Sequence, residues 1–206
     1  MCGRFASYSA YPKLARRMGV VIAEEGPPPR YNIPPGTWIS GFRQVAHEAP
    51  PEQFELWWGY RPKWAKGKAA QPINARVETV AASGYFNYAF AKQRCLIPAD
   101  GWFEWLVTET GKQPHYLTRT EREDGSLGCA ILTAPARGTA AEVHDRMPLI
   151  LDDASLEPWL DPDLTDRETI RHVVRHLDAS LIEHWAVSRA VNRPGNDEDA
   201  GLINPA

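Results

Sequence analysis

The chain lacks an excess of basic residues, and this absence limits how it can meet nucleic acid. Its 206 residues contain 23 Lys and Arg against 26 Asp and Glu, which gives a formal net charge of -3. A molecule with this balance has no overall attraction for phosphate. Any nucleic-acid site must therefore be a local basic patch.

Cysteine pairs and long apolar runs are also missing. Cys2, Cys95 and Cys129 are the three cysteines, and they form no CxxC pair, which argues against a disulfide framework and a structural zinc site. We expect Cys95 and Cys129 to be small buried hydrophobes. The apolar runs at 129–132 and 149–151 fall far short of the roughly 20 residues that span a bilayer. No signal-like stretch opens the chain, so a reducing, cytoplasmic compartment is expected.

What is present fits one domain over residues 1–206. Hydrophobic residues make up 43% and charged residues 24%, which are ordinary values for a globular chain. The proline-rich stretch at 27–35 predicts a surface loop, and Thr165 with Glu168 has the pattern of a capping box. The remaining patterns predict helices at 11–20, 155–160 and 165–177, and strands at 38–44, 53–60, 94–108, 115–120 and 128–133. The class is therefore mixed α+β.

The pair His172 and His176 has a spacing that can hold a metal on a helix. No Glu or third ligand stands beside the pair in the sequence, so we interpret both as surface histidines. We expect no metal and no cofactor.

The first residues, MCGRF, carry chemistry of their own. Because Cys2 is small, Met1 can be removed, which leaves an α-amine and a thiol on one residue. The α-amine has a pKa of about 7.7 to 8.0, against about 10.4 for lysine, so it can attack carbonyls near neutral pH. An aldehyde would give a Schiff base, and the thiol could close it into a thiazolidine. A cysteine at position 2 is weak evidence by itself.

Further segments accompany this start. They are RYN at 30–32, WGY at 58–60, PINARVET at 72–79, ADGWFEW at 99–105, VHDRMP at 143–148 and VSRAVN at 187–192. Together with MCGRF they resemble the SOS response-associated peptidase (SRAP) family, in order and over nearly the whole chain. The resemblance implies an α+β fold of mainly antiparallel strands, curled into a barrel-like form with flanking helices.

The resemblance also implies roles for four residues. Cys2 would be the crosslinking residue, Asn74 would position the N-terminus and the substrate, and Glu104 and His144 would supply acid-base chemistry. An abasic deoxyribose is mostly a closed hemiacetal, and an imidazole with a pKa of about 6.5 suits protonation of its ring oxygen. Apolar neighbours would raise the pKa of Glu104. From the neighbouring sequence alone, Glu104 could instead be an outward-facing strand carboxylate. On the same grounds, His144 beside Asp145 could be an ion-paired loop residue.

The segment RPKWAKGK at 61–68 offers cations and an aromatic face, as single-stranded DNA requires. The local alternative is a solvated loop. By resemblance, the DNA path would be lined by Arg4, Trp64, Arg76, Trp105, Thr133, Arg146 and Arg189.

The sequence thus predicts a monomer that captures abasic sites in single-stranded DNA through a thiazolidine crosslink. Its peptidase activity would be the removal of its own Met1, and the crosslinking would be lyase-like. Two alternatives stay open at this point. One is a thiol peptidase or N-terminal-nucleophile hydrolase that cleaves peptides in trans. The other is a single-strand binder that does not distinguish damage.

Overall fold

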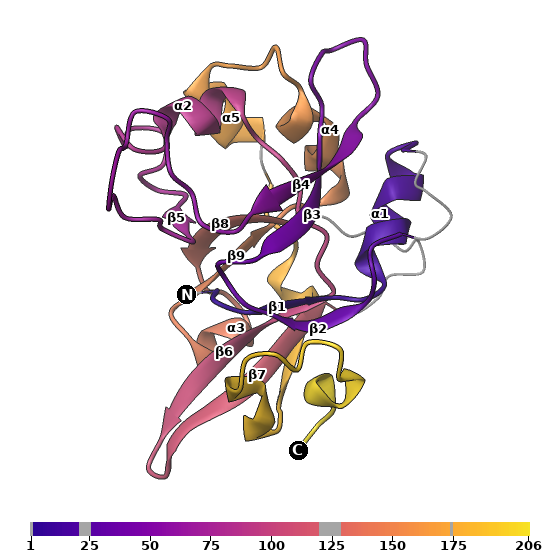
Figure 1. Ribbon diagram of the computed structural model, residues 1–206, viewed down its shortest axis with the longest axis vertical. Coiled ribbons are helices and arrows are strands. Elements are labelled where there is room, and N and C mark those ends of the chain that lie inside the picture. Colours follow the sequence, from indigo (N-terminus) through magenta and orange to yellow (C-terminus); the bar gives the residue numbers. More distant parts are fainter. Residues whose placement is uncertain (1, 21–25, 120–128, 174) are drawn as a thin grey trace.

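The strands of the molecule form three sheets, shown in a computed structural model that describes residues 2–20, 26–119, 129–173 and 175–206 (Figure 1). The largest sheet has five strands in the order β10-β7-β6-β1-β2, and its neighbours are all antiparallel. We call it the central sheet. Its strands are β1 (Phe5–Ser7), β2 (Arg30–Ile33), β6 (Gly101–Thr108), β7 (Gly111–Arg119) and β10 (Ile182–Ala186).

The other two sheets are smaller. The hairpin of β3 (Trp38–Arg43) and β4 (Glu52–Trp57) forms one of them. In the second, β8 (Cys129–Pro135) pairs in parallel with β5 (Ala75–Arg76) and antiparallel with β9 (Arg146–Ile150). The α+β class with mainly antiparallel strands is therefore confirmed.

The strands were expected to curl into a barrel-like form, and the described strands form no closed barrel. Backbone hydrogen bonds between Phe42 and Leu96 join β3 to the segment before β6 as an isolated bridge. A bridge of this kind does not continue a ladder, so the three sheets stay separate in their hydrogen bonding.

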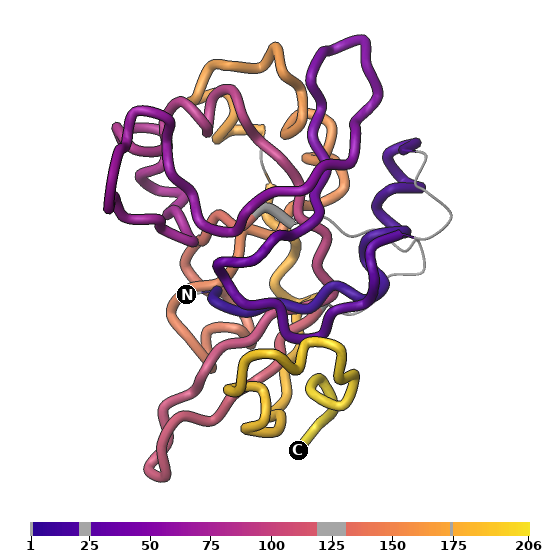
Figure 2. Tube along the Cα trace, in the orientation of Figure 1, coloured from indigo at the N-terminus to yellow at the C-terminus, as the bar shows by residue number. Residues whose placement is uncertain are grey.

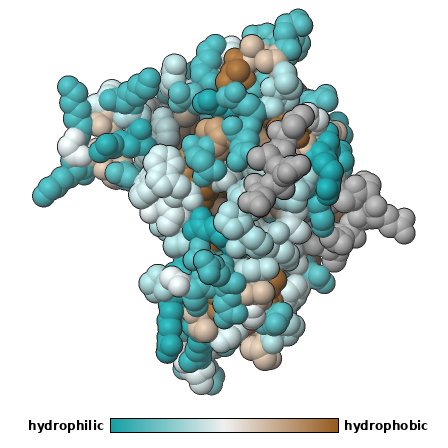
Figure 3. Space-filling view, turned by 45° about the vertical axis from the view of Figure 1, so that its right-hand side comes forward, coloured by the Kyte–Doolittle hydropathy of each residue, from teal (hydrophilic) through white to brown (hydrophobic). Residues whose placement is uncertain are grey.

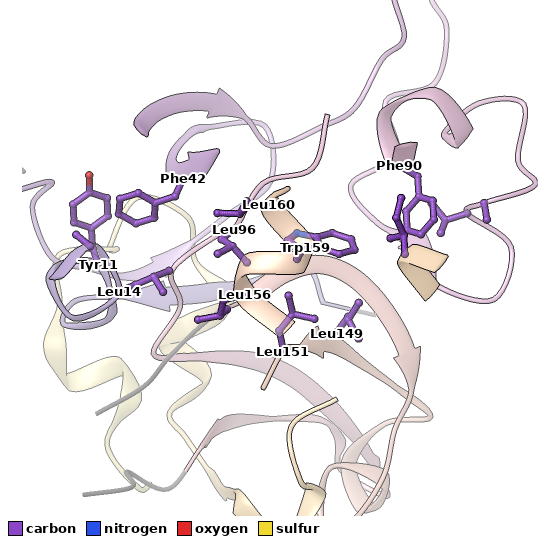
Figure 4. Packing of buried hydrophobic residues seen from close by; sticks show 14 residues of the cluster. Tyr11, Leu14, Phe42, Phe90, Leu96, Leu149, Leu151, Leu156, Trp159 and Leu160 are labelled. Atoms are coloured by element: carbon purple, nitrogen blue, oxygen red, sulfur yellow. The ribbon is translucent and has the colours of Figure 1, made fainter. Parts of the chain in front are cut away.

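Short helices surround the sheets and complete the core. They are α1 (Ala10–Arg17), α2 (Asn87–Lys92), α3 (Ala140–Val143), α4 (Leu156–Leu160) and α5 (Arg167–Val173), with 3-10 turns η1 (Asp153–Ser155), η2 (Ala179–Leu181), η3 (Arg189–Asn192) and η4 (Ala200–Ile203). One apolar cluster joins α1, α2 and α4 to β3 and β9, with Tyr11 stacked on Phe42 (Figure 4). The C-terminal turns lie beside the central sheet (Figure 2).

Several expected boundaries differ in the structure. Residues 27–35 include strand β2, in which Asn32 and Ile33 are buried, so this stretch is not simply a surface loop. The strand expected at 94–108 begins at Gly101. Helix α5 is shorter than 165–177, and its first turn is capped by the Asp166 carboxylate, which accepts from the Thr169 amide at 2.9 Å, instead of by Thr165. Residues 120 and 128 of two expected strands lie outside the described residues.

Asp100 and Gly101 show why β6 starts where it does. The Asp100 carboxylate accepts hydrogen bonds from the backbone N–H groups of Tyr8, Ser9 and Ala10 at 2.7, 2.9 and 3.1 Å, so it caps α1 from a distant part of the chain. A Cβ on Gly101 would collide with the Leu117 carbonyl and the Tyr116 ring. Both residues therefore hold the beginning of β6 against its neighbours.

Within the described residues, each helix is too short or too polar to cross a bilayer. On the face drawn in Figure 3, hydrophobic residues occur in small separate areas between hydrophilic ones.

Candidate active site

The central sheet has two faces that receive different side chains. Strand alternation and the β6–β7 register place Trp102, Glu104 and Leu117 on one face, which packs against α3. Phe103 and Tyr116 lie on the opposite face, with the C-terminal turns. We call the first the α3 face.

Cys2 lies at the α3 face, just before β1. Its residue is only 2% exposed and belongs to the apolar cluster that contains Phe5 and Trp102. The Cys2 Sγ lies 3.8 Å from the Arg4 carbonyl oxygen, which also accepts the Phe103 amide of β6 at 3.0 Å. The residue that would start the mature chain is thus held against β6. Met1 itself lies outside the described residues.

Asn74 fixes the backbone of Cys2. It lies directly before β5, and its Nδ2 donates to the Cys2 carbonyl oxygen at 2.7 Å. The Oδ1 atom of the same side chain is buried and has no hydrogen-bond partner among the described residues. A buried acceptor without a donor is costly, so this oxygen is suited to accept from a group that arrives later.

Glu104 is a buried carboxyl, because only 2% of the residue is exposed. Burial raises its pKa above the ordinary range, while the charge of His144 acts in the opposite direction. His144 therefore lies near enough to influence it. The local interpretation of Glu104 as an outward-facing strand carboxylate is wrong.

His144 follows α3 directly, and two groups approach its Nδ1. The Arg146 amide lies at 3.0 Å and the Asp145 carboxylate at 2.7 Å. An N–H can only donate, so it requires an unprotonated Nδ1, whereas the carboxylate would require a protonated one. The Asp145 side chain is 85% exposed and can turn to water, but the amide is fixed at the start of β9. We therefore assign the proton of the neutral ring to Nε2.

Arg146 and Thr133 form an internal network beside this site. The Arg146 guanidinium pairs with Glu78 and donates to the Thr133 carbonyl oxygen at 2.6 Å. The hydrogen bond from Arg146 is the main cause that lowers the pKa of Glu78. Thr133 is fully buried. These two residues therefore organise the β5-β8-β9 sheet, and Arg76 of β5 stays exposed.

On the other side of β6, three side chains lie near the turn η3: those of Arg4, Trp105 and Arg189. Arg4 donates to Asn32 Oδ1 and to the Val191 carbonyl oxygen, each at 2.8 Å, and burial lowers its pKa. The Trp105 indole donates to Asn192 at 2.8 Å, and Arg189 is exposed on the same turn, η3. In the described ladder, β1 pairs with β6 at Gly101 and Trp102. Glu104 and Trp105 lie farther along β6, past this pairing, and their side chains point to opposite faces of the strand.

The basic segment 61–68 lies farther out. Its four cations are exposed, and Trp64 is 64% exposed with its ring 5.5 Å from that of Tyr85. A cavity of ≈ 700 Å³ is lined by Tyr60, Arg61 and Asn74, among others. Arg61 at the start of the segment and Asn74, which binds the Cys2 carbonyl, thus line the same cavity.

Other groups that could react or bind a metal lie elsewhere. Burial raises the pKa of the Cys95 thiol to about 12, so it is no nucleophile at neutral pH. Cys129 lies in β8, and its side chain is outside the described residues. His172 is exposed on α5, whereas His176 lies beyond the end of that helix, so the helical spacing is not realised.

In the described part of the chain, His47, Asp161 and Asp163 bring potential ligand atoms within 4.8 Å of one another at the surface. The Asp161 carboxylate already accepts from the Asp163 amide at 2.9 Å and meets His47 Nδ1 at 3.4 Å. The group is explained by these contacts, and it lies apart from the site around Cys2.

Comparison with known proteins identifies the family of the whole chain. The model of the family described as SOS response associated peptidase (SRAP) matches residues 1–194. The chain therefore belongs to the SRAP family.

Individual relatives extend over the same length. The abasic site processing protein YedK of Escherichia coli (strain K12) is 31% identical, and the match covers 100% of both chains. The abasic site processing protein YoqW of Bacillus subtilis (strain 168) is 28% identical, with 96% of each chain covered.

Solved structures show the same fold. A protein from Bacteroides thetaiotaomicron has a TM-score of 0.80 at 18% identity, with 100% of both chains covered. A phage-related protein from Bordetella bronchiseptica has a TM-score of 0.71 at 29% identity, with 91% of this chain and 95% of that chain covered.

Proposed function

We propose that this protein processes abasic sites in DNA by bonding to them covalently through Cys2 in a single-stranded region. The names of the relatives YedK and YoqW support the substrate. The observation that carries the chemistry is the 2.7 Å hydrogen bond from Asn74 to the carbonyl of Cys2, whose cluster lies on the same sheet face as the buried Glu104.

The first step would open the sugar. The abasic deoxyribose is mostly a closed hemiacetal, so its ring oxygen must gain a proton before the aldehyde appears. With Nδ1 occupied by the Arg146 amide, His144 can offer its Nε2–H for this purpose. The aldehyde then faces the Cys2 amine, which exists once Met1 has been removed.

The second step would form the bond. The amine adds to the aldehyde carbon, and the resulting carbinolamine loses water to give an imine. Glu104 takes the proton released by the amine and returns one to the departing hydroxyl, a role that suits a carboxyl whose pKa is raised by burial. The Cys2 thiol then adds across the C=N bond, its proton passes to the nitrogen, and a thiazolidine results.

The same thiol lies next to the peptide bond that joins Met1 to Cys2. The word peptidase in the family description is compatible with removal of this one residue by the protein itself. Self-processing would expose the amine on which the crosslink depends.

The DNA would reach the site along the exposed cations. Arg76, Arg189 and the segment 61–68 are exposed, so their charges can meet phosphates. Arg4, Thr133 and Arg146 are occupied by internal hydrogen bonds, and they would shape the path instead. Trp64 and Trp105 would provide stacking faces on either side of it.

Intact mass spectrometry tests the proposal directly. The purified protein is expected to lack Met1 and, after incubation with an abasic single strand, to gain the mass of the oligonucleotide less one water molecule. Cys2→Ala should lose this adduct yet retain weak binding, because phosphate contacts do not need the thiol. Cys2→Ser should give an imine that only borohydride traps.

The alternatives predict different results. Cleavage of peptides in trans without any DNA adduct would make the protein a thiol hydrolase. Equal retention of intact and abasic strands, unaffected by Cys2→Ala, would make it a single-strand binder without a covalent function.

A further inference from the structure

Two histidines lie behind Glu104 on the α3 face of the central sheet. His115 of β7 is directly opposite Glu104 in the β6–β7 register. Directly opposed residues of antiparallel strands project to the same face, with Cβ atoms about 4.5 to 5.5 Å apart. His184 lies on β10, the next strand, and α3 packs against both β6 and β10.

Close contacts continue from His115 toward the surface. His115 Nδ1 lies 3.1 Å from His184 Nδ1, and His184 Nε2 lies 3.5 Å from Glu142 Oε2 on α3. Cross-strand pairing places the carboxyl of Glu104, which is 2% exposed, beside the first histidine, and the contacts end at the Glu142 side chain, which is 69% exposed. These side chains therefore lead from the strand position opposite a buried carboxyl to solvent.

The contacts also define where the protons are. Two Nδ1 atoms at hydrogen-bond distance require one N–H and one lone pair. The Glu142 carboxylate favours a proton on His184 Nε2, so in the neutral pair His184 Nδ1 accepts from His115 Nδ1–H. His115 Nε2 then keeps its lone pair. Burial and the charge of His184 both lower the pKa of His115, which favours this neutral state.

We propose that His115 and His184 form a relay that carries protons between Glu104 and the surface at Glu142. The inference rests on the proposed function, in which Glu104 takes and returns a proton. A proton on Glu104 moves to His115 Nε2, the proton on His115 Nδ1 moves to His184 Nδ1, and the proton on His184 Nε2 leaves to water beside Glu142. One proton enters and one leaves, and both rings end as the other neutral tautomer.

The return step is the same sequence in reverse. Besides Glu142, the charged groups of neighbouring elements that act on this scheme are His144 and Asp145, which follow α3 and influence the pKa of Glu104. The two histidines do not touch DNA in this scheme. They are positioning residues that act through Glu104.

Single-turnover adduct formation with His115→Phe tests the relay. The phenyl ring keeps the bulk and removes the nitrogens, and His172→Phe on the exposed face of α5 is the matched control. We expect His115→Phe to slow the reaction by roughly 10-fold to 100-fold, less than the loss of an acid-base group itself. Imidazole in the buffer should restore the rate, and the solvent deuterium isotope effect should increase. His172→Phe should match the parent.

The outcomes separate this inference from the proposed function. A parent protein that forms no adduct contradicts the proposed function. A parent that does form it, with folded His115→Phe equally fast at every pH, contradicts the relay alone. If His115→Phe does not fold, Glu142→Gln on the surface tests the outer end: a slower rate that imidazole restores supports the relay, and an unchanged rate overturns it.

Discussion

At the scale of single residues, Glu104 is placed where its charge is unfavourable. Burial raises its folded pKa, so between the unfolded and folded pKa values the native protein holds a proton that the unfolded chain has released. The stabilising effect of this proton is complete below the unfolded pKa and is lost as pH rises through the folded pKa. Above that interval, the buried charge lowers the free energy of unfolding.

Glu104→Gln removes this penalty together with the acid-base group. We expect the variant to be more stable than the parent at about pH 8, with the difference fading toward about pH 4. Adduct formation should slow by about 10² to 10⁴. Urea unfolding at both pH values and single-turnover rates measure the two effects. A stability difference that does not change with pH would show that Glu104 is not buried as a charge.

Motifs in the sequence predict residues of the candidate site, but not the side chains that surround them. The resemblance named Asn74 as the residue that positions Cys2, and the structure has a hydrogen bond between the two. His115 could not be found in this way. Its relation to Glu104 depends on the β6–β7 register, which follows from a turn at residues 109–110, whereas the strand pattern alone placed the start of β7 at residue 115.

At the scale of elements, Asp100 has a structural task within the same motif as Glu104. Its carboxylate satisfies three backbone N–H groups at the start of α1, and Ser9 Oγ also donates to it at 2.5 Å. The negative charge is favourable near a helix N-terminus. Hydrogen bonds to a charged group are each stronger than neutral ones. Asp100 therefore ties the first helix to the first residue pairs of β6.

Asp100→Asn should destabilise the protein without changing the chemistry. The amide keeps one acceptor oxygen and loses the charge, so we expect the free energy of unfolding to fall by about 2 to 3 kcal/mol. Below the melting temperature, the adduct should form at the parent rate, because the contacts of the Asp100 carboxylate in the described residues are with residues 8–10 at the start of α1 and not with the site. Chemical unfolding and intact mass measure these two effects. Retained stability would mean that α1 is capped by water instead.

This long-range cap also explains which element boundaries could be predicted. The strands expected at 38–44 and 53–60, from their β-branched and aromatic residues, are found with small shifts as β3 and β4. The residues before Gly101 have apolar side chains like a strand, yet they turn so that Asp100 can reach α1 and Leu96 can bridge to Phe42. Local patterns do not contain such distant partners.

At the scale of the whole molecule, a net charge of -3 conceals an uneven distribution. The segment 61–68 carries four cations and no acidic residue, and it lies beside the cavity that Asn74 lines. Helix α1, with Arg16 and Arg17 in its last turn, lies on the opposite side of the molecule (Figure 1). Two positive charges can therefore be removed either from the segment 61–68 or from α1, with the same effect on the net charge.

The salt dependence of DNA binding measures which side meets phosphate. Each phosphate neutralised on a single strand contributes about -0.7 to the slope of log K against log salt. We expect the double substitution Lys66→Ala and Lys68→Ala to reduce the slope by about 1.4 if each lysine meets one phosphate. Arg16→Ala with Arg17→Ala makes the same change in net charge and should leave the slope unaltered. Equal slopes for both double variants would mean that the molecule responds to its total charge, and the path along residues 61–68 would then be wrong. Fluorescence anisotropy with an intact single strand and Cys2→Ala as the background keeps the covalent reaction out of the measurement, so the slope reports phosphate contacts alone.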